Sequence, residues 1–196
     1  MTSPKAKARD SATRDALIRA TAQIMLEEGY ASATSRRVAA KAGVKPALVH
    51  YYFPSMDDLF LAVFQAGGEA NLDRQREALT DDQPLHTLWQ LNSAQASRLL
   101  MEFMALANHR KAIRSELVAY ADRFRDMEEA AMTLALRANG VDTKEFPPVV
   151  MSMIVGSLAR ILTMEQGLGI TRGHAEAQAF IDRYLDRFDM PSPTPT

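Results

Sequence analysis

Cationic side chains flank a short aromatic-rich segment between positions 34 and 53, and these residues are the best suited in this sequence to bind a polyanion. Arg36 and Arg37 fall in the first turn of a predicted helix over 35–42, where the helix dipole disfavours positive charge. Phosphate groups would compensate for that charge, and Arg36 is long enough to reach guanine in a major groove. Lys45 precedes a second predicted helix and suits a phosphate contact better than a helix cap.

The second predicted helix, over 46–53, has two unlike faces. At 100° per residue, Val49 and Phe53 share one side and are expected to be buried. The opposite side is expected to be exposed and carries Ala47, Leu48, His50 and Tyr51. Aliphatic and aromatic groups are unusual in solvent, but they can meet thymine methyl groups and other groove atoms, so this face is predicted to contact base edges.

Two short helices must hold these side chains in place. Thr34 is the predicted N-cap of the first helix, Gly43 its predicted stop, and Pro46 suits the first position of the second. The predicted apolar contacts between the helices are Val38, Ala39, Val44, Val49 and Phe53. This arrangement has the dimensions of a helix-turn-helix, whose second helix enters the major groove of DNA.

The remaining sequence has helical periodicity and no strand-like alternation. The predicted helices cover 11–28, 35–42, 46–53, 55–79, 85–92, 94–109, 111–139, 147–167 and 174–188. The chain is therefore expected to be all-α, with about nine helices. We divide it into a flexible basic arm (1–10), a DNA-binding domain (11–54), a ligand-binding and dimerisation domain (55–190) and a disordered tail (191–196).

The charge of the chain is unevenly distributed. Up to Phe53 there are nine Lys and Arg residues and four Asp and Glu residues, a net charge of +5. The rest must carry −6, because the whole chain has a net charge of −1. A basic block fused to an acidic body favours a local polyanion site, although a chance fluctuation in surface charge would look the same.

Residues 34–44 (TSRRVAAKAGV) and 45–59 (KPALVHYYFPSMDDL) resemble the DNA-binding signature of TetR-family regulators. Residues 17–30 are similar to the first helix of that family, which ends in a Gly-aromatic pair, and the resemblance spans roughly 12–64. Three positions depart from the pattern: His50 replaces a usual Tyr, Met56 a common Lys, and Lys45 a frequent Ser or Thr. The resemblance implies operator contacts by Thr34, Ser35, Arg36, Arg37, Lys45, Pro46, Ala47, Leu48, His50, Tyr51 and Tyr52.

The resemblance also implies an apolar effector cavity among the central helices. The predicted helix 111–139 presents one apolar seam, which is expected to pack in the core. Seven methionines in the C-terminal body would suit either a core or a pocket for apolar ligands. The residues expected to line the cavity are Trp89, Asn92, Met101, Glu102, Phe103, His109, Tyr120 and Phe124.

The last two predicted helices are expected to form the interface of a homodimer, as the family resemblance implies. Small residues on one helix and aromatic residues on the other allow close helix packing. The interface residues expected are Ser152, Gly156, Ala159, Phe180 and Tyr184. A two-fold dimer would place its recognition helices roughly 34–36 Å apart and bind double-stranded DNA at an inverted-repeat operator.

The composition excludes some classes of function. The chain has no cysteine, so disulfide and thiolate chemistry are absent. No signal peptide is apparent, and the apolar run 149–162 is shorter than a membrane span and contains Arg160, so a cytoplasmic protein without a membrane segment is expected.

No phosphate loop, zinc motif or nucleophile motif is present, so we expect neither an enzyme nor a bound cofactor or metal. The expected function is a DNA-binding regulator, a repressor by analogy with the family, released when a small-molecule effector prefers another conformation. The alternative is an all-α protein-interaction module with a basic N-terminus.

Overall fold

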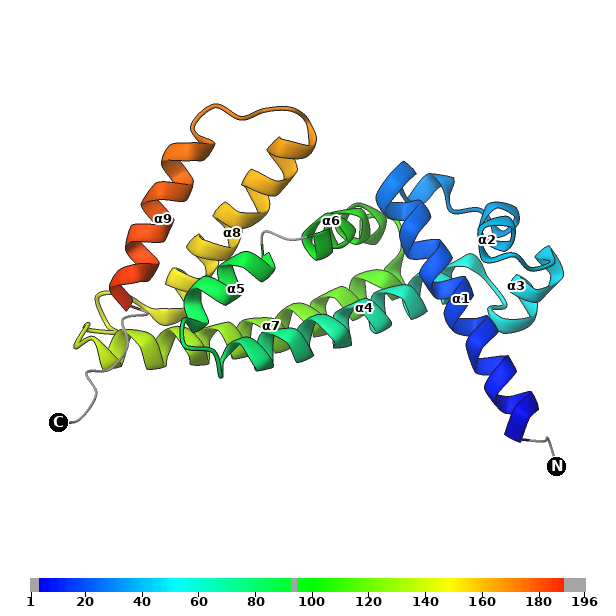
Figure 1. Ribbon diagram of the computed structural model, residues 1–196, viewed down its shortest axis with the longest axis horizontal. Helices are drawn as coiled ribbons and strands as arrows, with labels where there is room; N and C mark the ends of the chain where they lie inside the picture. The colour runs from blue at the N-terminus through cyan, green and yellow to red at the C-terminus, as the bar shows by residue number, and fades with distance from the viewer. Residues whose placement is uncertain (1–3, 93–94, 189–196) are drawn as a thin grey trace. The chain divides into compact units, whose positions relative to one another are not determined.

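The structure is a computed structural model that describes residues 4–92 and 95–188. Within these residues the chain forms α-helices and one 3-10 helix, and no strand, as expected for an all-α fold (Figure 1). The helices are α1 (Pro4–Glu28), η1 (Tyr30–Ser32), α2 (Ser35–Ala42), α3 (Pro46–Tyr52), α4 (Met56–Ala78), α5 (Pro84–Asn92), α6 (Gln95–Ala107), α7 (Lys111–Ala138), α8 (Pro148–Gly167) and α9 (His174–Phe188).

The chain forms two compact units. Unit 1 comprises the residues up to Gly68 together with Leu99–Val118, and unit 2 comprises Glu69–Arg98 together with the residues from Ala119 onward. Helices α4, α6 and α7 contribute residues to both. The boundary predicted at residue 54 coincides with neither edge, because the first half of α4 packs with unit 1.

The N-terminal segment is more helical than expected. Helix α1 begins at Pro4, so residues 4–10 belong to a helix and not to an arm. The sequence showed no apolar periodicity there, but Ala, Lys and Arg all have good intrinsic helix propensity and can extend a helix that already exists. The predicted tail at 191–196 lies outside the described residues.

The predicted caps of the two short helices are confirmed. Thr34 Oγ1 accepts a hydrogen bond from the backbone N–H of Arg37 at 3.4 Å and so caps α2. Gly43 ends α2 at φ 68° and ψ 30°, a left-handed conformation that favours glycine. Pro46 occupies the first turn of α3, and α3 ends before Phe53. These local signals fix the turn between α2 and α3.

The turns that precede α2 and follow α3 have different conformations. Ser55 and Asp58 form a capping box before α4, because the Asp58 carboxylate accepts from the Ser55 backbone N–H at 2.9 Å. Gly29 has positive φ, but its ψ of 161° is extended and not left-handed helical. The chain therefore leaves α1 in an extended step and forms η1, which the sequence did not predict.

The core of unit 2 is formed by α5, α8 and α9 with parts of α4 and α7. Helix α5 packs against both α8 and α9. The buried members of this cluster are Ala78, Leu85, Leu88, Trp89, Ala131, Met132, Leu136, Val155, Ala159, Ile181 and Leu185. This cluster is called the unit 2 core below.

Candidate nucleic-acid interface

The helix-turn-helix of unit 1 stands on a closely packed apolar base. Helix α2 packs against α1 on one side and against α3 on the other. The side chains buried in this base include Leu17, Ile24, Met25, Val38, Ala39, Val49 and Phe53. The only buried polar side chain described in this base is Thr21, whose hydroxyl donates to the Leu17 carbonyl at 2.8 Å. Close apolar packing of this kind holds α3 in one orientation.

Helix α3 has the two faces that the sequence predicted. Val49 is 1% exposed and Phe53 is 3% exposed, so this side of the helix is buried. On the other side Tyr51 is 72% exposed, and Ala47, Leu48 and His50 are also exposed. The helix therefore presents an exposed aromatic and aliphatic surface to its surroundings.

Tyr52, also predicted to contact DNA, has a partner within unit 1. Its hydroxyl donates a hydrogen bond to the Asp10 carboxylate at 2.6 Å, and this bond raises the pKa of Tyr52. The Tyr51 and Tyr52 rings are in edge contact at 5.0 Å. The Tyr52 hydrogen bond therefore links α3 to the N-terminal half of α1, and the Tyr51 ring packs against the edge-on ring of Tyr52.

The cations of α2 and of the turn before α3 fall into two groups. Arg37 forms an ion pair with Glu28 at the end of α1, and Lys41 donates to Glu27 at 2.7 Å. The hydrogen bonds from Lys41 and Gln23 lower the pKa of Glu27. Glu28 thus supplies the negative charge that Arg37 needs at a helix N-terminus, so the sequence argument for a phosphate there no longer holds for Arg37.

Arg36 and Lys45 form the other group. Both side chains are exposed, and neither has a hydrogen bond or ion pair among residues 4–92 and 95–188. They stand at the first residues of α2 and just before α3, at the ends of the helices that border the exposed face of α3. Together they leave positive charge available for phosphate oxygens.

Helix α6 and the turn that follows it brace this part of the chain from within unit 1. The Glu102 carboxylate accepts a hydrogen bond from the Tyr30 backbone N–H at 2.8 Å, at the junction of α1 and η1. Arg110 donates to the Asp57 carboxylate at 2.9 Å and 3.2 Å, in the first turn of α4. Both links involve charged side chains, and each fixes the end of a helix in unit 1.

The residues expected to line an effector cavity are divided between the units. Met101, Glu102, Phe103 and His109 lie in unit 1, where Phe103 is buried in edge contact with Phe64 at 5.0 Å. Four others, Trp89, Asn92, Tyr120 and Phe124, lie in unit 2.

In unit 2, Trp89 and Asn92 line a cavity of about 20 Å³ in the unit 2 core. Its other lining residues are Leu85, Leu88, Glu128, Met132, Ser152, Val155 and Leu185. Tyr120 and Phe124 stack at 6.0 Å on α7, and the Tyr120 hydroxyl accepts from Asn71 Nδ2 at 2.8 Å. The eight predicted residues therefore do not line one common cavity within either unit.

Glu128 is the residue of this interior that the sequence reasoning missed. Its Oε1 accepts a hydrogen bond from Asn92 Nδ2 at 2.9 Å, and burial raises the pKa of its carboxyl. Burial also lowers the pKa of Arg160 on α8. Glu128 directly follows Met127, which belongs to the apolar seam of α7. An acidic residue beside that seam was the signal in the sequence that could have indicated a buried carboxyl group.

Some of the predicted dimer residues are buried within unit 2, and others are exposed. Ser152, Gly156 and Ala159 are buried inside unit 2, in the core that α8 shares with α5 and α9. Phe180 is 59% exposed, and Tyr184 is partly buried in edge contact with Phe188. The exposed apolar side chains of α8 are instead Val150, Met153, Ile154, Ile161 and Met164.

Helix α8 is also the one helix of the described residues that is long and apolar enough to cross a membrane, with a mean hydropathy of 1.4 over its best window. The apolar run 149–162 is shorter than a membrane span, but the whole helix has 20 residues. One face of α8 packs in the unit 2 core, and Arg160 interrupts the apolar sequence of the helix.

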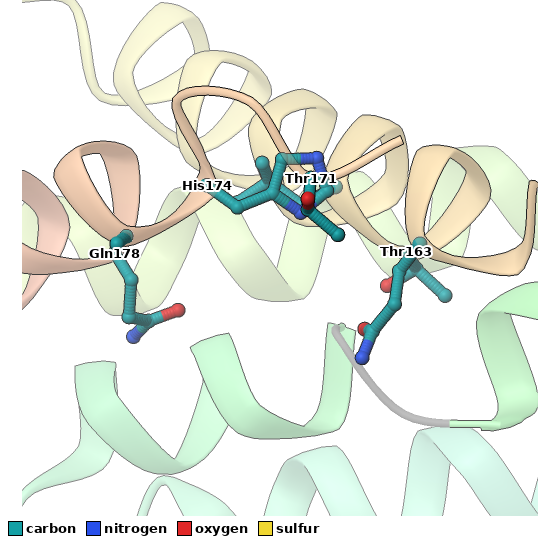
Figure 2. Close-up of a pocket in the computed structure, with 7 residues that line it drawn as sticks. Thr163, Thr171, His174 and Gln178 are labelled. Carbon is teal, nitrogen blue, oxygen red and sulfur yellow. The ribbon is translucent and has the colours of Figure 1, made fainter. Parts of the chain in front are cut away.

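A second, more open groove lies between the last turns of α8 and the start of α9 (Figure 2). It encloses about 350 Å³ and is lined by Leu162, Thr163, Gln166, Thr171, His174, Ala175 and Gln178. His174 Nε2 is 2.9 Å from Glu165 Oε2. Within the described residues, no group of three or more His, Asp or Glu side chains is placed to hold a metal ion.

Residues 17–63 match the model of the bacterial regulatory proteins of the tetR family. No curated protein sequence matches the chain. The fold is shared with solved transcriptional regulators of low sequence identity.

A TetR transcription regulator from Haloarcula marismortui is 22% identical with a TM-score of 0.70, covering 91% of this chain and 98% of that one. A TetR-family regulator from Rhodococcus sp. is 19% identical with a TM-score of 0.67, covering 88% and 98%. The fatty acid degradation regulator FadR from Bacillus halodurans is 15% identical with a TM-score of 0.65 and matches over 100% of both chains. Residues 17–63 thus carry the DNA-binding domain of the tetR family of bacterial regulatory proteins, and the all-α fold of the chain is shared with solved TetR-family transcriptional regulators.

Proposed function

We propose that this regulator is a repressor that binds an inverted-repeat operator as a homodimer and is released by a small, mainly apolar effector. The observation that carries the proposal is the exposed face of α3, where Tyr51 is 72% exposed on a helix whose other side is buried. An aromatic and aliphatic face bordered by unpaired Arg36 and Lys45 combines groups that read base edges with groups that bind phosphate.

The operator contacts follow from this geometry. Leu48, His50 and Tyr51 would enter the major groove, and Arg36 and Lys45 would bind phosphates or guanine at its border. Arg37 and Tyr52 support the surface through their partners in α1, and they are less available to DNA.

The experiment that tests DNA recognition is selection of bound duplexes from a randomised pool by the purified protein at near-physiological salt. The expected product is an inverted repeat with half-sites about one helical turn apart. A pool that stays random, with binding that disappears as salt rises, would leave only nonspecific electrostatic attraction and favour the protein-interaction module.

The proposed dimer interface is the exposed apolar face of α8, with Phe180 of α9. Only 22% of the most apolar window of α8 is buried within one chain. Side chains at Val150, Ile154 and Ile161 recur at helical spacing on this face, so two copies would bury a continuous stripe. Ser152, Gly156 and Ala159 then position α8 from inside, and they do not touch the second copy.

A single charge should disrupt this interface. Ile154→Asp is expected to yield a monomer with much weaker operator binding, because a carboxylate would be buried between the copies. The control is Leu134→Asp, at another exposed apolar residue of unit 2 on α7. Molar mass from sedimentation tests both variants, and an Ile154→Asp protein that keeps the mass of the wild type contradicts this interface.

A further inference from the structure

Gln75 of α4 is a buried side chain whose hydrogen-bonding capacity is unused. It is 0% exposed, and neither its Nε2 nor its Oε1 has a hydrogen-bond partner among the described residues. Burying an amide without partners opposes folding, and a leucine of similar size would avoid that penalty. Within the part of the chain that the structure describes, no group meets this requirement for Gln75, so its amide is available to a ligand.

The neighbouring contacts place Gln75 in the interior of unit 2. Helices α4 and α7 run in the same direction there, since Asn71 Nδ2 donates to Tyr120 Oη at 2.8 Å and Ala78 shares the unit 2 core with Ala131 (Figure 1). Gln75 stands one turn after Asn71 and one turn before Ala78. It is therefore at the level of residues 124–128 of α7.

That level of α7 contains Glu128, the acidic member of the small cavity in the unit 2 core. Glu128 accepts a hydrogen bond from Asn92, and among the described residues it forms no ion pair. Burial shifts the pKa of Glu128 upward and that of Arg160 downward, so desolvation at this level penalises the charged form of each group. The interior is polar at this level but disfavours charge.

We infer that Gln75 is the polar anchor of the effector site, and that the effector is a neutral molecule with an apolar body and one edge offering both a hydrogen-bond donor and an acceptor. The inference rests on the proposed release by an effector. A carboxamide would accept from Nε2 and donate to Oε1 of Gln75, and so pair both groups. A carboxylate would leave Oε1 unpaired, an ammonium would leave Nε2 unpaired, and each would bring an unpaired charge into the core.

The apolar body of such a ligand would enter the small cavity that Glu128 lines at the same level of α7. Six of its nine lining residues are apolar, and all six belong to the unit 2 core with Ala78. The volume of about 20 Å³ holds one water, so a ligand must displace lining side chains such as the flexible Met132. A ligand that selects a more open unit 2 would stabilise a conformation other than this one, as effector release requires.

The first test needs no ligand. Gln75→Leu is expected to raise the Tm of the ligand-free protein by at least about 2 °C, because it removes an unpaired buried amide. Gln178→Leu is the matched control, since Gln178 is exposed in the α8–α9 groove and donates to Asp182 at 2.7 Å (Figure 2). A lower Tm for Gln75→Leu would show that internal water already satisfies this amide, and would overturn the inference.

The second test uses three probes with the same alkyl chain: octanamide, octanoate and octylamine. Octanamide is expected to raise the Tm of the wild type and to weaken its operator binding. Both responses should be at least tenfold weaker in Gln75→Leu, whereas Gln178→Leu should respond as the wild type does. Equal responses to the charged probes, no response to octanamide, or a response that Gln178→Leu alone removes would each overturn the inference. If octanamide stabilises the wild type through Gln75 but leaves operator affinity unchanged, the site stands and the proposed effector release fails.

Discussion

Unit 1 and unit 2 place their polar side chains differently. In unit 1 the ion pairs of Arg37, Lys41 and Arg110 lie at the surface, and the base under α3 is apolar. In unit 2 polar side chains lie inside, and Gln75 has no partner among the described residues. An apolar base suits a surface that must keep one shape, whereas unmet interior polar groups suit a site that changes when a ligand binds.

The largest effect should come from the apolar base of unit 1. Phe53→Ala is expected to lower the free energy of unfolding by about 3–5 kcal/mol, because it leaves a cavity where a side chain only 3% exposed was packed. Urea unfolding at constant m-value measures the loss.

Tyr51→Ala on the same helix is the control for Phe53→Ala. Tyr51 is 72% exposed, so its removal should change stability by no more than about 0.5 kcal/mol. Operator affinity should nevertheless fall about tenfold or more if Tyr51 meets base edges. Equal stability losses in the two variants would contradict the two-faced description of α3.

A smaller effect is expected from Glu102, which holds the junction of α1 and η1. Glu102→Ala removes the acceptor of the Tyr30 N–H and should cost about 1–3 kcal/mol, with a severalfold loss of operator affinity. Glu102→Gln keeps an acceptor oxygen and should restore most of both. If glutamine rescues neither stability nor affinity, the carboxylate acts through something other than this hydrogen bond.

The local features of unit 1 could be predicted from the sequence because they depend on neighbouring residues. Thr34, Gly43 and Pro46 each act on one helix end, and the spacing of Val49 and Phe53 defines a buried face. The start of α1 was missed since its first two turns lack apolar periodicity. The ion pair of Arg37 with Glu28 was missed because it depends on the angle between α1 and α2, which no local pattern specifies.

The interior of unit 2 could not be predicted in the same way. Its polar residues come from α4, α5, α7 and α8, so their grouping depends on how four helices pack. Ser152, Gly156 and Ala159 are small residues on one helix face, and that pattern alone does not distinguish packing within a chain from packing between chains. The exposed stripe of α8 became visible only after the buried face was known.

Glu128 offers a pH test of the interior. Its pKa is raised in the folded state by burial, so its contribution to stability is fully present below the ordinary pKa of 4.5 and is lost as pH rises through the raised value. Glu128→Gln stays neutral and keeps an acceptor for Asn92. We expect a higher Tm than the wild type at neutral pH, and no difference at acidic pH where Glu128 is protonated.

Tm measured across this pH range checks the prediction for Glu128. A Glu128→Gln protein that is less stable than the wild type at neutral pH would show that the Glu128 carboxylate is stabilised by attraction to Arg160 more than it is penalised by burial.

The smallest effect is expected at the surface of unit 1. Lys41 donates to Glu27 and lowers its pKa, so the stability from this pair is present above the ordinary pKa of 4.5 and is lost as pH falls through the lowered value. Because the Glu27 side chain is exposed to solvent, Lys41→Met should lower Tm only slightly at neutral pH, and not at all at high salt or low pH. Thermal unfolding at two salt concentrations measures this. A loss as large as that of Glu102→Ala would mean that the surface pairs of α2 hold the helix-turn-helix in place, and unit 1 would then depend on polar contacts as much as unit 2.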